Sequence, residues 1–302
     1  MIYVSLLGCF FFLMILYPSI TFEGACNGLI LWFQTVLPTL LPLAIISNLL
    51  IATNGIHFIS RYISKLFYNF FHVSSSGSYA VLIGFLCGYP MGAKTIADLV
   101  RSHHISPKEG QYLLSFCNNT SPMFIIGYLV LQNFQDKKLL LPSLIILMAT
   151  PILCSFFFRS RYRNKELHFA KTIQTSNGIT FHFELFDQAI LNGFETLTKV
   201  GGYIVLFSIL LLFAKQLPHS TLFAFLEITN GIPCILETNF SFEIQFILCL
   251  ALVSFGGLCS VLQTRAMIQD SGLSIRPYIK EKLITAMVTS FISYVYIYLI
   301  RS

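Results

Sequence analysis

Charged side chains are scarce in this chain. Only 11% of its 302 residues are Asp, Glu, Lys or Arg, whereas soluble domains carry about 25%. Hydrophobic residues make up 55% of the chain, and the mean hydropathy is +0.74. So few polar side chains cannot cover the surface of a water-soluble fold of this size. The composition therefore predicts an integral membrane protein, a single membrane domain over residues 1–302 with the lipid bilayer as its surroundings.

Recognisable catalytic and ligand-binding motifs are also missing. The H-E-x-x-H, G-x-S-x-G and Walker A patterns are absent. None of the eight cysteines forms a C-x-x-C pair, and most of them lie in apolar runs. The net charge of +6 comes from basic residues in short connecting segments, where they set orientation, and not from a continuous basic stripe. We therefore expect no enzyme activity, no cofactor, no metal site and no nucleic-acid partner.

Several apolar stretches are long enough, or nearly so, to cross a hydrocarbon core about 30 Å thick. They are residues 2–20, 29–52, 117–132, 139–158, 200–217 and 283–300. Two shorter glycine-rich stretches, 77–90 and 242–258, are each followed by a polar helix-like segment. Such interrupted segments at matching places in two halves are typical of broken or re-entrant helices around a binding site. The expected fold is all-α, a polytopic membrane helical bundle of about six to eight spans, two of them broken or re-entrant.

The two halves of the chain resemble each other weakly. An Asn-Gly pair begins an apolar helix at Asn27 and again at Asn192, and Gly84–Gly88 resembles Ser254–Leu258. Both spacings are near 165–170 residues. A duplication would divide the chain at its basic segment.

The proposed division has a first half at about 20–158, a basic linker at 159–184 and a second half at about 185–300. The linker carries five Lys or Arg residues between 159 and 171 and should be cytoplasmic. The long helices of the two halves would then run in opposite directions, as in an inverted repeat. Two alternatives stay open, because 77–101 and 242–270 can each either cross the membrane or re-enter on one side.

The segment Leu185–Lys199 has apolar residues at helical spacing on one face and charged residues on the other. This pattern predicts a separate amphipathic helix at the membrane interface, ahead of the span at 200–217. Its simplest role is to cover the end of the bundle.

Three segments are more polar than a membrane helix requires. The first combines glycines, which let backbones approach closely, with a helix-breaking proline and a lysine. Helix packing with a lysine that reaches the interface is the alternative reading. The candidate solute-binding or gating residues in this segment are Gly84, Gly88, Tyr89, Pro90, Gly92 and Lys94.

The second segment contributes Asn118, Asn119, Ser121 and Pro122 as candidates. Polar groups at membrane depth are costly and tend to be functional, and asparagine amides can both donate to and accept from an uncharged solute. A helix cap at the interface is the alternative.

The third segment, 227–231, supplies the candidates Glu227, Thr229 and Asn230. An external turn at its Asn-Gly pair is the alternative.

These segments carry a family resemblance. The sequence GFLCGYPMGAK at 84–94 is followed by ADL, by SPKEGQYLLSFCNNTSPMFIIG at 106–127 and by LEITNG at 226–231. Together they resemble the YlbJ-type sporulation integral membrane proteins, part of the wider nucleoside-recognition or gate-domain group. The resemblance extends from about residue 25 to the last helix. Ser254–Thr264 lacks the proline and lysine of the first motif, so a two-fold site would be asymmetric.

The resemblance implies a multi-pass protein in the cell membrane of an endospore-forming bacterium, needed for spore formation. The wider group is similar to gated segments of concentrative nucleoside transporters and of ferrous-iron transport proteins.

Two functions follow as hypotheses. The first is a transporter-like protein or gated pore for a small polar solute. Asn118 and Asn119 would contact the solute, and Gly88 and Pro90 would shape the helix break. Lys94 would supply a countercharge or a gating contact. The alternative is a non-transporting scaffold of the developing spore, which would dock other sporulation membrane proteins.

Overall fold

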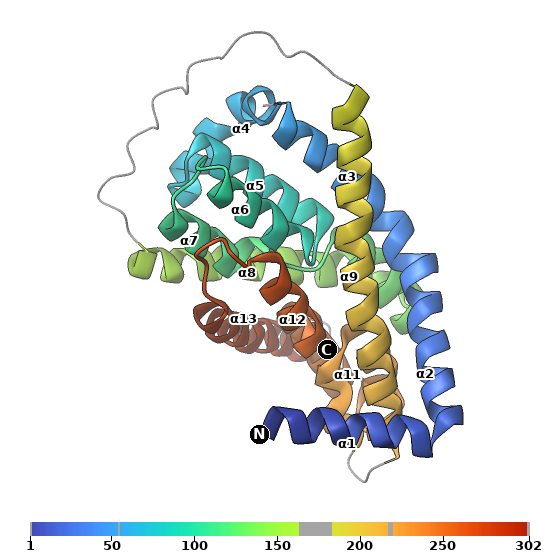
Figure 1. Cartoon of the computed structure of the whole chain (residues 1–302). Coiled ribbons are helices and arrows are strands. Elements are labelled where there is room, and N and C mark those ends of the chain that lie inside the picture. Colours follow the sequence, from blue (N-terminus) through green and yellow to red (C-terminus); the bar gives the residue numbers. More distant parts are fainter. Residues whose placement is uncertain (1, 54, 163–182, 217–219, 301–302) are drawn as a thin grey trace.

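The computed structural model describes residues 2–53, 55–162, 183–216 and 220–300, and every regular element in these ranges is a helix (Figure 1). The first half contains α1 (Ile2–Leu16), α2 (Pro18–Leu31), η1 (Trp32–Val36), α3 (Leu37–Ala52), α4 (Ile56–Phe71), α5 (Ser75–Cys87), α6 (Met91–Arg101), α7 (Pro107–Cys117), η2 (Phe124–Phe134), η3 (Lys137–Leu139) and α8 (Leu140–Tyr162). The second half contains α9 (Phe183–Lys215), η4 (Ser220–Leu226), α10 (Ile228–Leu236), α11 (Phe242–Phe255), α12 (Gly257–Met267), α13 (Ile275–Val295) and η5 (Tyr296–Ile300).

The described residues contain five helical runs that are long and apolar enough to cross a membrane. They are Pro18–Ala52, Lys137–Tyr162, Phe183–Lys215, Phe242–Met267 and Ile275–Leu299. A sixth arises if Ser60–Phe71 and Ser75–Cys87, bent by 88°, form one span. The polytopic helical bundle is confirmed; the described residues hold five such spans, or six with the bent pair, against the six to eight expected.

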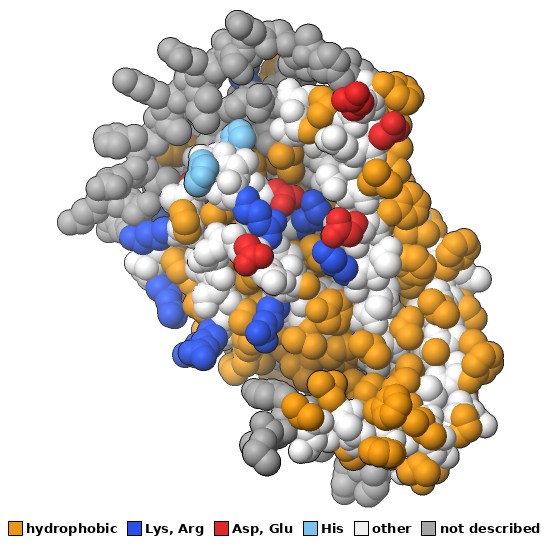
Figure 2. Space-filling model, viewed as in Figure 1, with side chains coloured by type: hydrophobic (Ala, Val, Ile, Leu, Met, Phe, Trp, Pro, Cys, Tyr) orange, Lys and Arg blue, Asp and Glu red, His pale blue; other side chains and the backbone are white. Residues whose placement is uncertain are grey.

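Exposed apolar side chains cover the outside of the long helices. Phe22, Phe33 and Leu206 are all exposed, and Figure 2 shows a wide hydrophobic field on the side where α2 and α9 lie. Such a surface is stable only against an apolar solvent, which lipid provides.

The first apolar stretch is divided differently from the expectation. Instead of one helix over 2–20, α1 ends at Leu16 and α2 begins at Pro18. Proline favours the first turn of a new helix because it has no N–H to donate. From Pro18 the helix then continues through η1 to Ala52, so it is much longer than the expected span at 29–52.

The helix expected at Leu185–Lys199 is present, but it is not a separate interfacial helix, because α9 runs without a break from Phe183 to Lys215. The Gly201–Gly202 pair does not interrupt it. Gly201 instead makes room for the indole of Trp32, whose Nε1–H donates to the Leu197 carbonyl at 2.8 Å.

The expected linker at 159–184 lies mostly outside the described residues. Arg159 and Arg161, at its start, belong to the last turn of α8. Its cytoplasmic placement stays a prediction.

The long helix of each half packs against that of the other half. A Cβ atom at Gly24 would lie 2.8 Å from Ile209 Cα, and one at Gly28 would lie 2.7 Å from Val205 Cα. Further along, Asn48 donates to the Ala189 carbonyl at 3.2 Å. Residue numbers rise along one helix as they fall along the other, so α2–α3 and α9 are antiparallel. Glycine allows this close contact between helix backbones.

The order of elements also repeats. A long helix begins at Pro18 and again at Phe183, and the last unit begins at Pro107 and again at Ile275, offsets of 165 and 168 residues. Between them, each half has an interrupted helix. Together with the antiparallel long helices, this order agrees with the inverted repeat that the sequence suggests.

The interruptions lie at the expected places. The α5–α6 break contains Gly88, at φ 81°, and a cis Tyr89–Pro90 bond. The α11–α12 break is at Gly256, at φ 90°. The second interruption is milder, because Phe242–Met267 still forms one continuous run. A third break, over residues 118–121, separates α7 from η2, so the span expected at 117–132 begins with irregular backbone.

Candidate functional site

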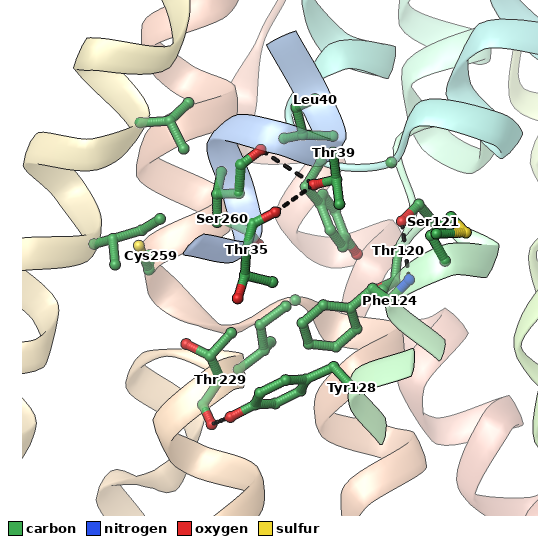
Figure 3. A pocket seen from close by; sticks show the side chains of 18 of the residues that line it. Thr35, Thr39, Leu40, Thr120, Ser121, Phe124, Tyr128, Thr229, Cys259 and Ser260 are labelled. Atoms are coloured by element: carbon green, nitrogen blue, oxygen red, sulfur yellow. Dashed lines mark hydrogen bonds between the residues drawn. The ribbon is translucent and has the colours of Figure 1, made fainter. Parts of the chain in front are cut away.

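A cavity of about 390 Å³ lies where the interruptions of the two halves meet (Figure 3). Its wall includes residues of the three helix breaks, namely Gly88, Tyr89, Thr120, Ser121 and Gly256. The long helices close another side with Thr35, Val36, Thr39, Leu40, Val200 and Ile204.

Equivalent positions of the two halves line this cavity. Thr35 and Val200 are 165 residues apart, and Gly88 and Gly256 are 168 residues apart. The same offsets separate the starts of the two long helices and the starts of the last units of the two halves. The cavity therefore lies between the two halves.

Hydroxyl groups supply most of the polar lining. Thr35, Thr39, Thr120, Ser121, Tyr128, Thr229 and Ser260 bring them from both halves. In Figure 3 the rings of Phe124 and Tyr128 lie together on one side, with centroids 4.9 Å apart. Hydroxyls among apolar walls suit an uncharged polar solute with a flat or apolar part.

Glu227 is the one charged residue that lines the cavity within the described residues, and it already has partners. Its carboxylate accepts the N–H groups of Thr229, at 2.9 Å, and Asn230, at 2.8 Å, as the N-cap of α10. The Thr229 hydroxyl donates to it as well. Because the helix N-terminus compensates this charge, the cavity does not present a free anion.

The external turn considered for 227–231 is therefore wrong, since Glu227 caps α10 and the residues after it form the first turn of this helix. Asn230 does not line the cavity; its Nδ2 donates to the Ser208 hydroxyl of α9 at 3.1 Å.

Tyr89 joins the first break to the second. Its hydroxyl donates to the Ser254 carbonyl at 3.0 Å, just before Gly256. Gly88 in turn lies against the third break, because a Cβ atom there would be 2.6 Å from the Ser121 N atom. The Thr120 hydroxyl donates to the Val253 carbonyl at 2.9 Å, so the third break also contacts the end of α11, beside the second break.

Gly84 and Gly92 have a packing role. A Cβ atom at Gly92 would lie 2.6 Å from the Cys117 carbonyl oxygen, and one at Gly84 would lie 2.8 Å from the Cys117 carbonyl carbon. These two glycines let α5 and α6 cross the end of α7, and neither lines the cavity. Pro90 caps α6, and Pro122 precedes η2 beside the Ser121 hydroxyl, which accepts from the Phe124 N–H at 3.3 Å.

Asn118 is buried and makes its hydrogen bonds within the protein. Its Oδ1 accepts from the Ala93 N–H at 3.2 Å, and its Nδ2 donates to the hydroxyls of Thr264, at 2.8 Å, and Tyr278, at 2.9 Å. Asn118 does not line the cavity in this conformation. Its expected contact with solute stays a prediction.

Asn119 is used in the same way. Its Nδ2 donates to the Phe116 carbonyl at 2.5 Å, and its Oδ1 accepts from Lys282 at 3.1 Å. Asn119, too, lies outside the cavity wall.

Lys282 was missed by the sequence analysis, which placed the last span at 283–300. In the structure α13 begins at Ile275, and the Lys282 side chain is only 1% exposed. Its ammonium donates to the Asn118 carbonyl at 3.3 Å and to Asn119, and it lies 5.0 Å from the centroid of the Tyr89 ring. The burial could not be recognised, because Lys282 stands in a run of charged residues that resembles a connecting loop.

Lys94 lies away from the cavity. Its ammonium pairs with Asp98 at 2.7 Å and donates to Asn48 Oδ1 at 3.0 Å. It lines a second hollow of about 410 Å³, together with Glu195 and Lys199 of α9. The expected role of Lys94 as a countercharge or gating contact stays a prediction.

Comparison with known proteins adds one relative. No family model and no solved structure matches the chain. The chain is 27% identical, over 312 aligned residues, to the sporulation integral membrane protein YlbJ of Bacillus subtilis (strain 168). The alignment covers 89% of this chain and 75% of that relative. With the apolar helices, it supports a multi-pass membrane protein of a spore-forming bacterium. The chain is therefore similar to a YlbJ-type sporulation integral membrane protein, the type that its motifs resemble.

Proposed function

We propose that this protein is transporter-like, a carrier or gated pore for a small uncharged polar solute, and that spore formation requires it. It is not an enzyme in this proposal and uses no cofactor. The observation that carries the proposal is the shared cavity, which the helix breaks of both halves line. Solute sites at the interface of two repeats, built from discontinuous helices, are typical of secondary transporters.

The three breaks support this role on physical grounds. Irregular backbone within a membrane is tolerated only where protein buries it or where it lines a wet cavity. Gly88, Gly256 and the 118–121 segment all bring such backbone to one place. A packing defect would not place equivalent breaks of two halves around one space.

The lining indicates the solute class. A volume of about 390 Å³ is within the range of small-molecule sites. Several lining hydroxyls, those of Thr39, Thr120 and Ser260 among them, already donate to protein carbonyls, but their oxygens can still accept hydrogen bonds from a neutral solute. Phe124 and Tyr128 offer a flat apolar surface. A nucleoside-like molecule, which the wider gate-domain group suggests, has these features.

The asparagine pair takes a supporting role in the proposal. Asn118 and Asn119 hold the third break against α12 and α13 through Thr264, Tyr278 and Lys282. Direct contact with solute would require these hydrogen bonds to open during the transport cycle.

A ligand screen tests the proposal. We would follow thermal unfolding of the detergent-solubilised protein against nucleosides, neutral amino acids, dicarboxylates and common cations. A ligand at 100 times its Kd stabilises the folded state by about 2.7 kcal/mol. This shift should shrink or disappear in Thr39→Leu, because leucine removes a lining hydroxyl and occupies part of the cavity.

Thr21→Leu is the matched control. Thr21 and Thr39 each donate to the carbonyl four residues before them, but only Thr39 lines the cavity. Equal ligand shifts in the two variants would contradict the assignment of the cavity.

The scaffold is the second candidate. Phe183, Leu191 and Phe194 are exposed along one part of α9 and are available to lipid or to a protein partner. If Leu191→Asn abolishes spore formation while Thr39→Leu leaves it unchanged, the scaffold function is favoured. The reverse result favours transport.

A further inference from the structure

Two hollows follow one another between the same helices. On α3 the cavity is lined by Thr39 and Leu40, and the second hollow by Asn48 and Ile51. On the antiparallel α9, Val200 lines the cavity, and the second hollow begins only with Lys199 and continues to lower residue numbers.

The other two helices give the same order. The α5–α6 break lines the cavity with Tyr89, while Lys94 and Arg101, further along α6, line the second hollow. On α12, Ser260 lines the cavity, and Met267 lines the second hollow. All four helices therefore place the second hollow beyond the same end of the cavity.

The second hollow is charged and opens to the outside. The side chains of Glu195 and Lys199 at its edge are 65% and 56% exposed. Figure 2 shows basic and acidic side chains gathered on this face of the molecule, next to the hydrophobic field. Asp98 pairs with Arg101 at 2.8 Å as well as with Lys94, so charges of both signs lie together. Water can enter a charged hollow of this kind. Because charges of both signs line it, it does not favour solutes of one charge.

A small apolar cluster lies between the hollows. Ala44, Cys87 and Met91 pack together, and each of them is at most 1% exposed. Along the chain, Ala44 lies between Leu40 and Asn48, and Met91 lies between Tyr89 and Lys94. Methionine is unbranched and has several rotatable bonds, so its side chain can swing aside with little strain.

We propose that the charged hollow is the aqueous mouth of the cavity and that the Met91 side chain is the barrier between them. This inference rests on the proposed function and adds the route by which solute reaches the site. The opposite route, sideways past the exposed Met123 on the cavity wall, is the competing possibility that the test must separate.

Thiol labelling tests the route without knowledge of the solute. All eight cysteines are replaced, Ser260→Cys is introduced in the cavity wall, and the protein is reconstituted in vesicles. A charged, membrane-impermeant thiol reagent then reports water access to position 260. Met91→Ala should speed labelling about tenfold or more, which corresponds to at least about 1.4 kcal/mol off the barrier. Met123→Ala should leave the rate unchanged.

Asn192→Trp provides an independent arm that does not touch the apolar cluster. Asn192 lines the charged hollow, so an indole there should slow labelling, whereas Leu191→Trp, on the neighbouring exposed position, should not. The proposed route is wrong if neither Met91→Ala nor Asn192→Trp changes the labelling rate. It is also wrong if Met123→Ala is the variant that speeds labelling, or if position 260 is never labelled. Ligand-induced thermal stabilisation reports binding in the cavity, and it does so by whichever route the solute enters. A ligand shift combined with unchanged labelling therefore rejects only the route.

Discussion

Lys282 is a buried lysine that has no carboxylate partner among the described residues. The oxygens around its ammonium belong to the Asn118 carbonyl and the Asn119 amide, and the Tyr89 ring lies on it. Burying an ammonium costs several kcal/mol unless such groups replace its water. Carbonyl oxygens freed by a helix break can do so, because they no longer accept bonds within a helix. The break at 118–121 and the lysine therefore stabilise each other.

This mutual dependence gives a prediction for the residue. Lys282→Ala should lower the free energy of unfolding by about 2–4 kcal/mol, because it leaves buried oxygens unpaired and opens a cavity. Lys282→Met, which keeps most of the volume, should lose less. Thermal unfolding in detergent measures both. Lys280→Ala, two residues away and exposed, is the control and should stay within about 0.5 kcal/mol of the unchanged protein. Equal effects at the two positions would contradict the account.

At the scale of elements, close helix packing depends on which glycines face a neighbour. Gly201 and Gly202 are adjacent in α9, yet a Cβ atom at Gly201 would lie 2.8 Å from the Trp32 ring, whereas one at Gly202 meets nothing within 4 Å. Substitutions at Gly202 therefore report helix propensity alone, whereas substitutions at Gly201 also report packing against Trp32.

Alanine at each position should act in opposite directions. Gly202→Ala should stabilise the protein by about 0.5–1 kcal/mol, because alanine is the better helix former. Gly201→Ala should destabilise it by about 1–3 kcal/mol, because the indole must move and its hydrogen bond to Leu197 weakens. Melting temperatures of the two variants, measured side by side, check the sign. Stabilisation by both would mean that Trp32 does not pack on α9 as described.

The helices also show which features of the fold could be predicted from the sequence. Apolar length and glycine-proline content predicted the helices and the breaks at Gly88 and Gly256, because those signals are local. A helix boundary was wrongly predicted between Lys199 and Val200, because an amphipathic pattern followed by an apolar pattern resembles two helices. The polar face of α9 is explained by the second hollow, which no local pattern records. Lys94, Asn118 and Lys282 acquire their partners from distant helices, so their places depended on tertiary structure.

At the scale of the whole molecule, the halves meet through equivalent elements. Trp32 bonds to Leu197, Tyr89 to Ser254 and Arg101 to Met267, pairs that are 165 or 166 residues apart. These bonds run from the long helices, past the cavity, to the rim of the charged hollow. A change in how the halves fit together would therefore alter both hollows at once.

Tyr89 is the point at which this coupling can be tested in cells. Tyr89→Phe removes the bond to Ser254 but keeps the ring over Lys282, so the free energy of unfolding should fall by only about 1 kcal/mol. If the halves work as a transporter, the yield of heat-resistant spores should nevertheless drop clearly at an unchanged protein level. Tyr294→Phe, at an exposed tyrosine of α13, should leave the yield intact. Equal spore yields from both variants would mean that the contact between the breaks serves stability alone. A loss confined to Tyr89→Phe would place the joint between the two halves within the working cycle of the protein.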